Sequence, residues 1–224
     1  MLSRFGYCSR REAADWVADG RVTMDSGAVK RADAKADPEA ALVDGAPIEF
    51  PSGLLVTLHK PVGYACSHDT AEAPLIYDLL PPQWMRRNPG PISIGRLDRD
   101  TSGLILITDD GALCHRLTAP AHEVEKCYEI TSGTPLPTHL AALFAAGTLL
   151  LKGESKPCRP ARLEVTGPHT ARIFLHEGKY HQVRRMFASQ GCPLTALHRP
   201  AFGLLTLNGL AEGEWRTVQA AELA

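Results

Sequence analysis

The chain has 224 residues, 44% of them hydrophobic and 22% charged, so it can bury a sizeable core and is not a disordered polypeptide. No apolar run approaches the ~18–20 residues of a membrane span, and Arg4, Arg10 and Arg11 interrupt the stretch in which a secretory signal would carry its apolar segment. We therefore expect a soluble, cytoplasmic protein with no membrane partner. The net charge of −1 gives no general support for nucleic-acid binding, so that partner has to be argued from local basic clusters.

The cysteines and histidines do not follow the patterns of a disulfide framework or a metal site. The six cysteines are scattered with no Cys-x-x-Cys pair, and the nine histidines contain neither His-x-x-x-His nor His-Glu-x-x-His. Secreted disulfide scaffolds and structural zinc sites need closer, repeated spacings. We expect reduced thiols and no bound metal.

The first fifty residues predict a helix followed by a short hairpin. Ser9 and Glu12 have the spacing of a capping box, and Gly20 is placed to end the helix. Residues 21–24 and 28–29 have the pattern of two short strands, with a tight turn at 25–27. The composition changes near residue 50, and residues 51–53 have the composition of a linker. The basic side chains of this segment gather at the start of the helix and on the hairpin, where an ordinary solvated surface would also place them.

From residue 54 onward the pattern is rich in strands with single helices between them. Two segments, 139–146 and 181–188, have helical spacing, and each is followed by a glycine, Gly147 or Gly191. Strands interrupted by single helices indicate an α+β fold with a mixed or antiparallel sheet. The predicted strands are 54–59, 92–97, 127–131, 162–165, 172–175 and 204–207.

The stretch 95–111 is the most informative for chemistry. Two apolar strands flank a polar loop in which Asp98 lies between Arg96 and Arg99. Neighbouring positive charge favours the ionised carboxylate, which can act as a nucleophile, a base or a metal ligand. A loop aspartate in a surface salt bridge is the alternative. Residues 109–111 have the composition of a turn.

The Gly-Arg-Leu-Asp sequence at 95–98 resembles the motif of pseudouridine synthases, in particular the branch of the ribosomal small subunit enzymes. Three further segments match that family in the same order: Lys-Pro-x-Gly at 60–63, Lys-x-Tyr at 126–128, and the stretch 177–187. Residues 8–13 and 20–23 are similar to an S4-like RNA-binding module, and we expect this chain to begin inside the first helix of that module. The resemblance implies an S4-like α/β module at 1–50 and a synthase domain at 54–224.

The resemblance also implies roles for individual side chains. Asp98 matches the catalytic aspartate of the family, Tyr128 would stack on the base and could remove the C5 proton, and Arg184 would pair with Asp98 to keep it ionised. Arg96 would contact the flipped nucleotide or its phosphate, and Arg185 a phosphate. The remaining basic groups expected to hold phosphates are Arg10, Arg11, Lys60, Arg86, Arg87, His198 and Arg199.

The implied reaction converts a uridine of ribosomal RNA to pseudouridine and gains or loses no atoms, so we expect no cofactor. The expected substrate is 16S RNA, free or within a small-subunit assembly intermediate, with 23S RNA as the alternative and a monomer as the active form. Two other functions are open. Asp98, Asp100, Asp109 and Asp110 could bind Mg²⁺ or form a glycosidase carboxylate pair, and the chain could be a non-catalytic RNA-binding or ribosome-assembly protein.

Overall fold

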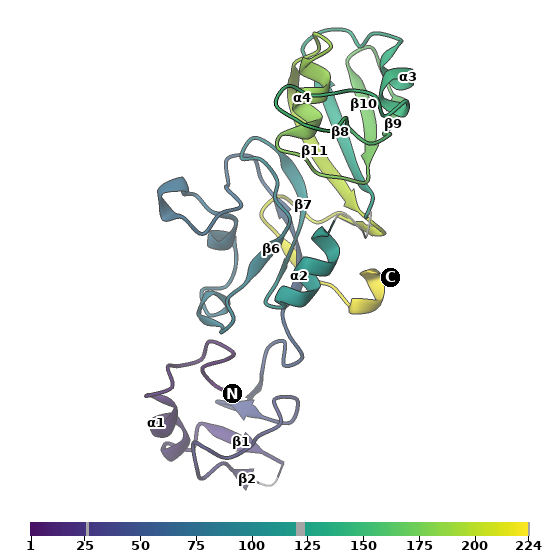
Figure 1. Cartoon of the computed structure of the whole chain (residues 1–224). Helices are drawn as coiled ribbons and strands as arrows, with labels where there is room; N and C mark the ends of the chain where they lie inside the picture. Colours follow the sequence, from purple (N-terminus) through teal and green to yellow (C-terminus); the bar gives the residue numbers. More distant parts are fainter. Residues whose placement is uncertain (26, 120–123, 224) are drawn as a thin grey trace.

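The computed structural model describes residues 1–25, 27–119 and 124–223. Figure 1 shows an elongated molecule in which a small block with α1, β1 and β2 lies at one end and the strands β8 to β11 lie at the other. No helix in the described part of the chain is long and apolar enough to cross a membrane.

Helix α1 (Ala13–Ala18) follows the predicted capping box. The Ser9 amide donates to Glu12 Oε2 at 2.8 Å, and the Glu12 amide donates to Ser9 Oγ at 3.3 Å. This reciprocal pair satisfies two amides that have no partner inside the helix. Gly20 adopts a positive φ of 71° and ends the helix, as its position predicts.

The small block contains its own sheet and its own apolar cluster. Strand β1 (Val22–Met24) pairs with β2 (Gly27–Ala28) and with β3 (Leu42–Val43), which pairs with β4 (Ala46–Pro47). The predicted hairpin is present, although Ser26 of its turn lies outside the described residues. Seven buried side chains fill the space between α1 and the sheet: Leu2, Phe5, Val17, Val22, Ala41, Val43 and Ile48.

The larger block is built on a nine-stranded sheet in the described residues, with the order β13-β5-β7-β11-β8-β10-β9, β6 beside β7 and β12 beside β11. Strands β7 and β11 are parallel and every other described pair in this sheet is antiparallel, which confirms the predicted α+β class with a mixed sheet. The strands are β5 (Leu55–Lys60), β6 (Ile92–Ile94), β7 (Ser102–Thr108), β8 (Lys126–Ser132), β9 (Arg162–Val165), β10 (Thr170–Leu175), β11 (Leu194–Phe202), β12 (Leu205–Thr206) and β13 (Trp215–Thr217).

The parallel contact between β7 and β11 joins the two halves of this sheet, and a glycine makes it possible. Gly103 pairs with Arg199 and has a φ of 117°. A Cβ atom at position 103 would lie 2.3 Å from the Arg199 carbonyl oxygen, which no side chain tolerates. The two backbones can therefore approach only because residue 103 has no side chain.

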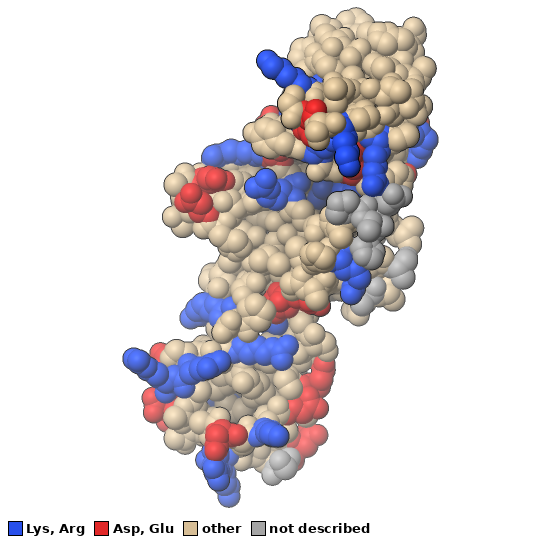
Figure 2. Space-filling view, in the orientation of Figure 1, with Lys and Arg blue, Asp and Glu red and all other residues tan. Residues whose placement is uncertain are grey.

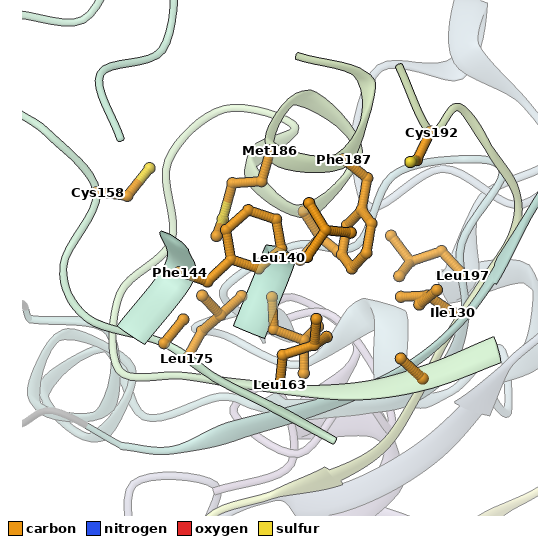
Figure 3. Packing of buried hydrophobic residues seen from close by; sticks show 14 of the residues in the cluster. Ile130, Leu140, Phe144, Cys158, Leu163, Leu175, Met186, Phe187, Cys192 and Leu197 are labelled. Atoms are coloured by element: carbon orange, nitrogen blue, oxygen red, sulfur yellow. The ribbon is translucent and has the colours of Figure 1, made fainter. Parts of the chain in front are cut away.

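Helices α3 (Leu140–Ala145) and α4 (Gln182–Ala188) cover the end of the sheet that carries β8 to β11. Figure 3 shows Leu140 and Phe144 meeting Met186 and Phe187 above the strands, and the two phenylalanine rings lie 5.2 Å apart edge to face. Both helices end as predicted, because Gly147 and Gly191 have positive φ. Short 3₁₀ helices lie at Thr70–Glu72, Ile76–Leu79, Trp84–Arg86 and Ala220–Leu223.

One sequence prediction in this block is wrong, and one strand of the structure was not predicted. The predicted turn at 109–111 is instead the start of helix α2 (Gly111–Thr118), because the Asp110 carboxylate accepts the amides of Ala112 and Leu113 and caps the helix. Strand β11 was not predicted, since it carries His198, Arg199 and Pro200 and does not look like a buried strand in sequence.

Arg87, which forms a buried ion pair with Asp109 inside the larger block, also binds the end of the small block. The Arg87 Nε donates to Asp109 Oδ2 at 2.8 Å, and its other nitrogens donate to the carbonyls of Glu49 and Phe50 at 3.1 Å each. Asp109 Oδ1 also accepts the amide of Leu54 at 2.7 Å. The chain segment between the blocks is thus fixed against the larger sheet by charge-assisted hydrogen bonds.

Candidate active site

Asp98 lies in the loop between β6 and β7, and the backbone of this loop is held from two directions. The Thr101 amide donates to the Asp98 carbonyl at 3.0 Å and closes a turn. The Gly63 amide donates to the Arg99 carbonyl at 2.7 Å, while the Arg99 guanidinium donates to the carbonyls of Gly63 and Ala73. The loop therefore has a fixed conformation before any substrate binds, which favours catalysis by positioning.

Lys60 binds the same loop from inside the protein, whereas the sequence predicted that it contacts an RNA phosphate. Its side chain is fully buried, and its Nζ donates to the carbonyls of Pro61 at 2.9 Å, Arg99 at 3.3 Å and Thr101 at 2.7 Å. Burial lowers the pKa of this ammonium group. Because all three donors are used inside the protein, Lys60 cannot contact an RNA phosphate in this conformation.

An open hollow of about 400 Å³ lies over the loop. The Asp98 side chain is 28% exposed there, so it can reach a ligand while remaining partly shielded from water. The residues that line the hollow are Val62, Gly63, Asp98, Arg99, Asp100 and His181.

The structure corrects the predicted pairing of Arg184 with Asp98. Arg184 projects from α4, and its Nη2 lies 3.0 Å from Asp100 Oδ2 and 2.9 Å from the Asp100 carbonyl oxygen. Its Nη1 donates to the Leu194 carbonyl at 3.3 Å. The turn that begins at Asp98 places Asp100, two residues later, next to α4. Arg184 thus fixes the loop through Asp100 rather than through Asp98.

The side chain beside Asp98 is His181, a residue to which the sequence analysis assigned no role. Its Nε2 lies 3.3 Å from Asp98 Oδ1. His181 precedes α4 in the left-handed conformation, with φ 46° and ψ 38°, and its ring stacks on Tyr180 with centroids 3.9 Å apart. Its place in the stretch 177–187, one turn before Arg184, was the available signal.

Tyr128 lies on β8 and is outside the lining of the hollow. Its ring packs against the apolar clusters on both sides of the β7–β11 contact, and the Arg199 guanidinium lies 5.9 Å from the ring centroid. The tyrosine therefore occupies the junction of the two halves of the sheet, with its side chain half-buried.

Three further arginines expected to hold phosphates are instead used inside the protein. Arg185 donates to Glu154 Oε1 at 2.8 Å and to the carbonyls of Tyr180 and Lys152. Arg199 is buried and donates to the Leu104 carbonyl, and Arg87 is buried against Asp109. Arg87 has an ionic partner, because an unpaired buried charge is costly, whereas the Arg199 Nη2 is buried with no hydrogen-bond partner among the described residues. In this conformation Arg87 and Arg199 are buried away from an RNA phosphate, whereas the phosphate contact of Arg185, which is partly exposed, stays a prediction.

Arg96, Arg10 and Arg11 are exposed, and each is free of hydrogen bonds and ion pairs to the other described residues. Figure 2 shows basic side chains on the small block and across the middle of the larger block, whereas the end with α3 and α4 carries few charges on this face. These exposed arginines remain available to an anionic ligand.

His198, the other basic group predicted to hold a phosphate, is half-buried, and its Nδ1 is 2.9 Å from Ser102 Oγ. Burial, together with the nearby His59, lowers the pKa of His198. Its charge is therefore disfavoured, and it contributes little attraction for an anion.

A second hollow of about 420 Å³ lies against the face of β8 that is opposite to the Tyr128 side chain. Cys127 and Glu129 point into it because they alternate along the strand with Tyr128. Its arginine, Arg172, is tied to Glu129 at 2.9 Å. It contains no aspartate on a fixed loop, so the hollow at Asp98 is the better candidate for a catalytic site. Within the described residues, no group of three or more His, Cys, Asp or Glu side chains could hold a metal ion.

The family model for RNA pseudouridylate synthase matches residues 54–189, which contain Asp98, Tyr128, His181 and Arg184. The chain belongs to the RNA pseudouridylate synthase family.

Similar members of the family extend the match beyond the synthase region. The chain is 41% identical over 220 residues to the ribosomal small subunit pseudouridine synthase A of Salmonella typhimurium, covering 96% of this chain and 93% of the relative. It is 40% identical over 221 residues to the protein of that name from Escherichia coli, with the same coverage. A solved crystal structure of a pseudouridylate synthase superposes with a TM-score of 0.71 at 33% identity, over 99% of this chain and 95% of that one. The small block is thus included in these alignments.

Proposed function

We propose that this synthase converts one uridine of small-subunit (16S) ribosomal RNA to pseudouridine, with Asp98 as the catalytic carboxylate. The observation that carries the proposal is a partly exposed aspartate on a fixed loop at an open hollow, in a chain about 40% identical over nearly its whole length to small-subunit synthases. The reaction breaks the N1–C1′ bond and forms a C5–C1′ bond. The C5 proton leaves and N1 gains a proton, so atoms and electrons balance within the base.

The residues around Asp98 support the positions required for this chemistry. Lys60 and Arg99 fix the loop backbone, and Arg184 fixes it through Asp100. We propose that Tyr128 acts from the junction of the two half-sheets as a platform for the base and as a possible acceptor of the C5 proton, which requires the uridine to enter beyond the open hollow. A uridine within an RNA stack must first be flipped out, and Arg96 is the exposed cation next to this loop that is free to stabilise that nucleotide.

The small block would bind RNA as an S4-like module. It combines α1 with a short antiparallel sheet and presents Arg10 and Arg11 to solvent beside the helix start. Phosphate contacts from such arginines give affinity without sequence information. We propose that the reaction takes place in the cytoplasm and that a single chain carries it out.

The experiment uses 16S RNA transcribed with tritium at uridine C5, since the new bond at C5 must release that tritium to water. We expect release by the wild type and none above background by Asp98→Asn, while Asp25→Asn, an exposed aspartate of the small block, stays at the wild-type rate. Free RNA, assembling small subunits and 23S RNA are tested in parallel. Release only from 23S RNA would reassign the substrate. RNA binding with no release from any of them would leave a non-catalytic binding protein.

A further inference from the structure

We propose that His181 is a positioning residue that orients the Asp98 carboxylate, a role that rests on the proposed function of Asp98. The starting observation is that Arg184, the expected partner of Asp98, is occupied by Asp100 and by two carbonyls. Among the described residues, the one side chain within ion-pair distance of Asp98 is His181, at 3.3 Å from Nε2 to Oδ1.

The imidazole can hold the carboxylate in either of its protonation states. In the doubly protonated form the ring places a positive charge 3.3 Å from Asp98 Oδ1, and in the neutral tautomer with the proton on Nε2 it places the N–H dipole beside that oxygen. Oδ2 remains available in both cases. An aspartate on a loop can otherwise rotate about χ1 and χ2, so one fixed oxygen determines where the other points.

The imidazole itself is oriented by its neighbours. Tyr180 stacks on it with a 17° angle between the ring planes, although the tyrosine is 69% exposed. The His181 carbonyl accepts the Arg185 amide and so begins the hydrogen bonds of α4. Arg185 in turn donates to the carbonyl of Tyr180 and to Glu154. The ring that reaches Asp98 is therefore carried by a braced helix start and not by a free loop.

The backbone at position 181 supports the same conclusion. His181 adopts φ 46° and ψ 38°, a left-handed conformation that glycine adopts at less cost than any residue with a Cβ atom. Glycine would relieve this strain, but it would leave Asp98 without a partner. Strained residues that persist at a site are a reason to look for a function of the side chain. Here the function is contact with the carboxylate.

The experiment compares His181→Gly and His181→Asn with the wild type in the tritium-release assay, together with thermal unfolding. Glycine keeps the backbone conformation and removes the donor, whereas asparagine keeps the backbone and retains a shorter N–H donor. We expect His181→Gly to be at least as stable as the wild type, with kcat lowered ~10- to 100-fold and KM within about twofold. His181→Asn should recover part of the lost kcat.

His139→Gly is the matched control, because His139 is the exposed residue before α3 and has an ordinary helical φ of −77°. It should leave kcat unchanged and lower stability slightly. A wild-type kcat in His181→Gly would overturn the proposal, and so would a fall in kcat that tracks a loss of stability. Absence of tritium release by the wild type itself would instead refute the proposed function, so the two failures are distinguishable.

Discussion

Lys126 makes the stability of this protein depend on pH in a predictable direction. Its Nζ donates to the Val124 carbonyl at 2.8 Å beside the Phe202 ring, and burial, reinforced by the charge of Arg199, lowers its pKa from 10.5 to about 8. Below pH 8 the folded protein carries the full cost of burying the charge. Between pH 8 and 10.5 the unfolded chain binds more protons than the folded one, so this group makes unfolding harder as pH rises.

The measurement is the urea unfolding free energy of wild type and Lys126→Met at pH 7 and pH 10. Removing the ammonium removes its pH dependence, so any advantage of the methionine variant at pH 7 should shrink, or turn into a deficit, at pH 10. Lys152→Met changes an exposed lysine and should show no such drift. Parallel pH profiles for wild type and Lys126→Met would contradict the prediction.

The residues show how far sequence reasoning reaches into the site. Spacing and family motifs located the loop with Asp98, because a short polar loop between two strands is a local feature. They assigned RNA contacts to Lys60 and Arg185, whose side chains bind groups of the protein itself. Whether a basic side chain faces solvent or such internal acceptors depends on segments distant in the sequence. They also paired Arg184 with the wrong aspartate, since a turn of two residues decides which carboxylate meets α4.

Among the helices and strands, too, the sequence predicts those that follow a local pattern and misses those that depend on distant segments. Strands β5, β8, β9 and β10 and helices α3 and α4 follow local patterns of apolar residues and end at predicted glycines or turns. Strand β11 could not be predicted from the local sequence. Its Arg199 is buried because it donates a hydrogen bond to the Leu104 carbonyl, and the strands that pair with β11 lie far away in sequence. Long-range pairing of this kind is decided by packing and not by propensity.

The parallel contact of β7 with β11 gives a second prediction. In Gly103→Ala the new Cβ would meet the backbone of Arg199 at 2.3 Å, so the strands must separate, and we expect a loss of roughly 3 kcal/mol or more. Thermal unfolding measures it. Gly20→Ala is the control, because Gly20 also has positive φ but nothing lies within 4 Å of its Cβ position, so it should lose only about 1–2 kcal/mol. Equal losses in the two variants would show that the close contact is not present in solution.

At the scale of the whole molecule, Arg87 is one of the groups that hold the two blocks in one arrangement, beside the hydrogen bond from Trp84 to Glu49. The Arg87 side chain is 1% exposed and its partner Asp109 is 11% exposed, so removing the guanidinium leaves a nearly buried carboxylate unpaired. We expect Arg87→Met to cost ~3–5 kcal/mol and to make residues 51–53 sensitive to limited proteolysis, because the carbonyls of Glu49 and Phe50 lose their donors. Arg31→Met breaks a pair that is 78% and 70% exposed and should leave the free energy of unfolding nearly unchanged. An unchanged cleavage pattern in Arg87→Met would show that other contacts hold the blocks together.

The arrangement of the blocks matters because the arginines expected to bind RNA are spread over both. With Lys60, Arg87, Arg185 and Arg199 used internally, the sequence-independent part of RNA affinity falls to exposed cations such as Arg10 and Arg11. Each phosphate contact adds ~0.7–0.9 to the slope of log Kd against log salt concentration. The double variant Arg10→Ala/Arg11→Ala should therefore weaken RNA binding and lower that slope by roughly 1 to 2, while kcat at saturating RNA stays at the wild-type value.

Fluorescence anisotropy of labelled 16S RNA at several salt concentrations measures this slope. Arg162→Ala is the control, because Arg162 lies on β9 at the edge of the large sheet and is already paired with Glu164 and stacked on Phe174. It removes one unit of charge without removing a cation that is free to bind phosphate, so its slope should match that of the wild type. If the double variant kept the wild-type slope, Arg10 and Arg11 would not be contacting phosphates. RNA would then have to bind through other exposed cations, such as Arg96, which lies two residues before Asp98.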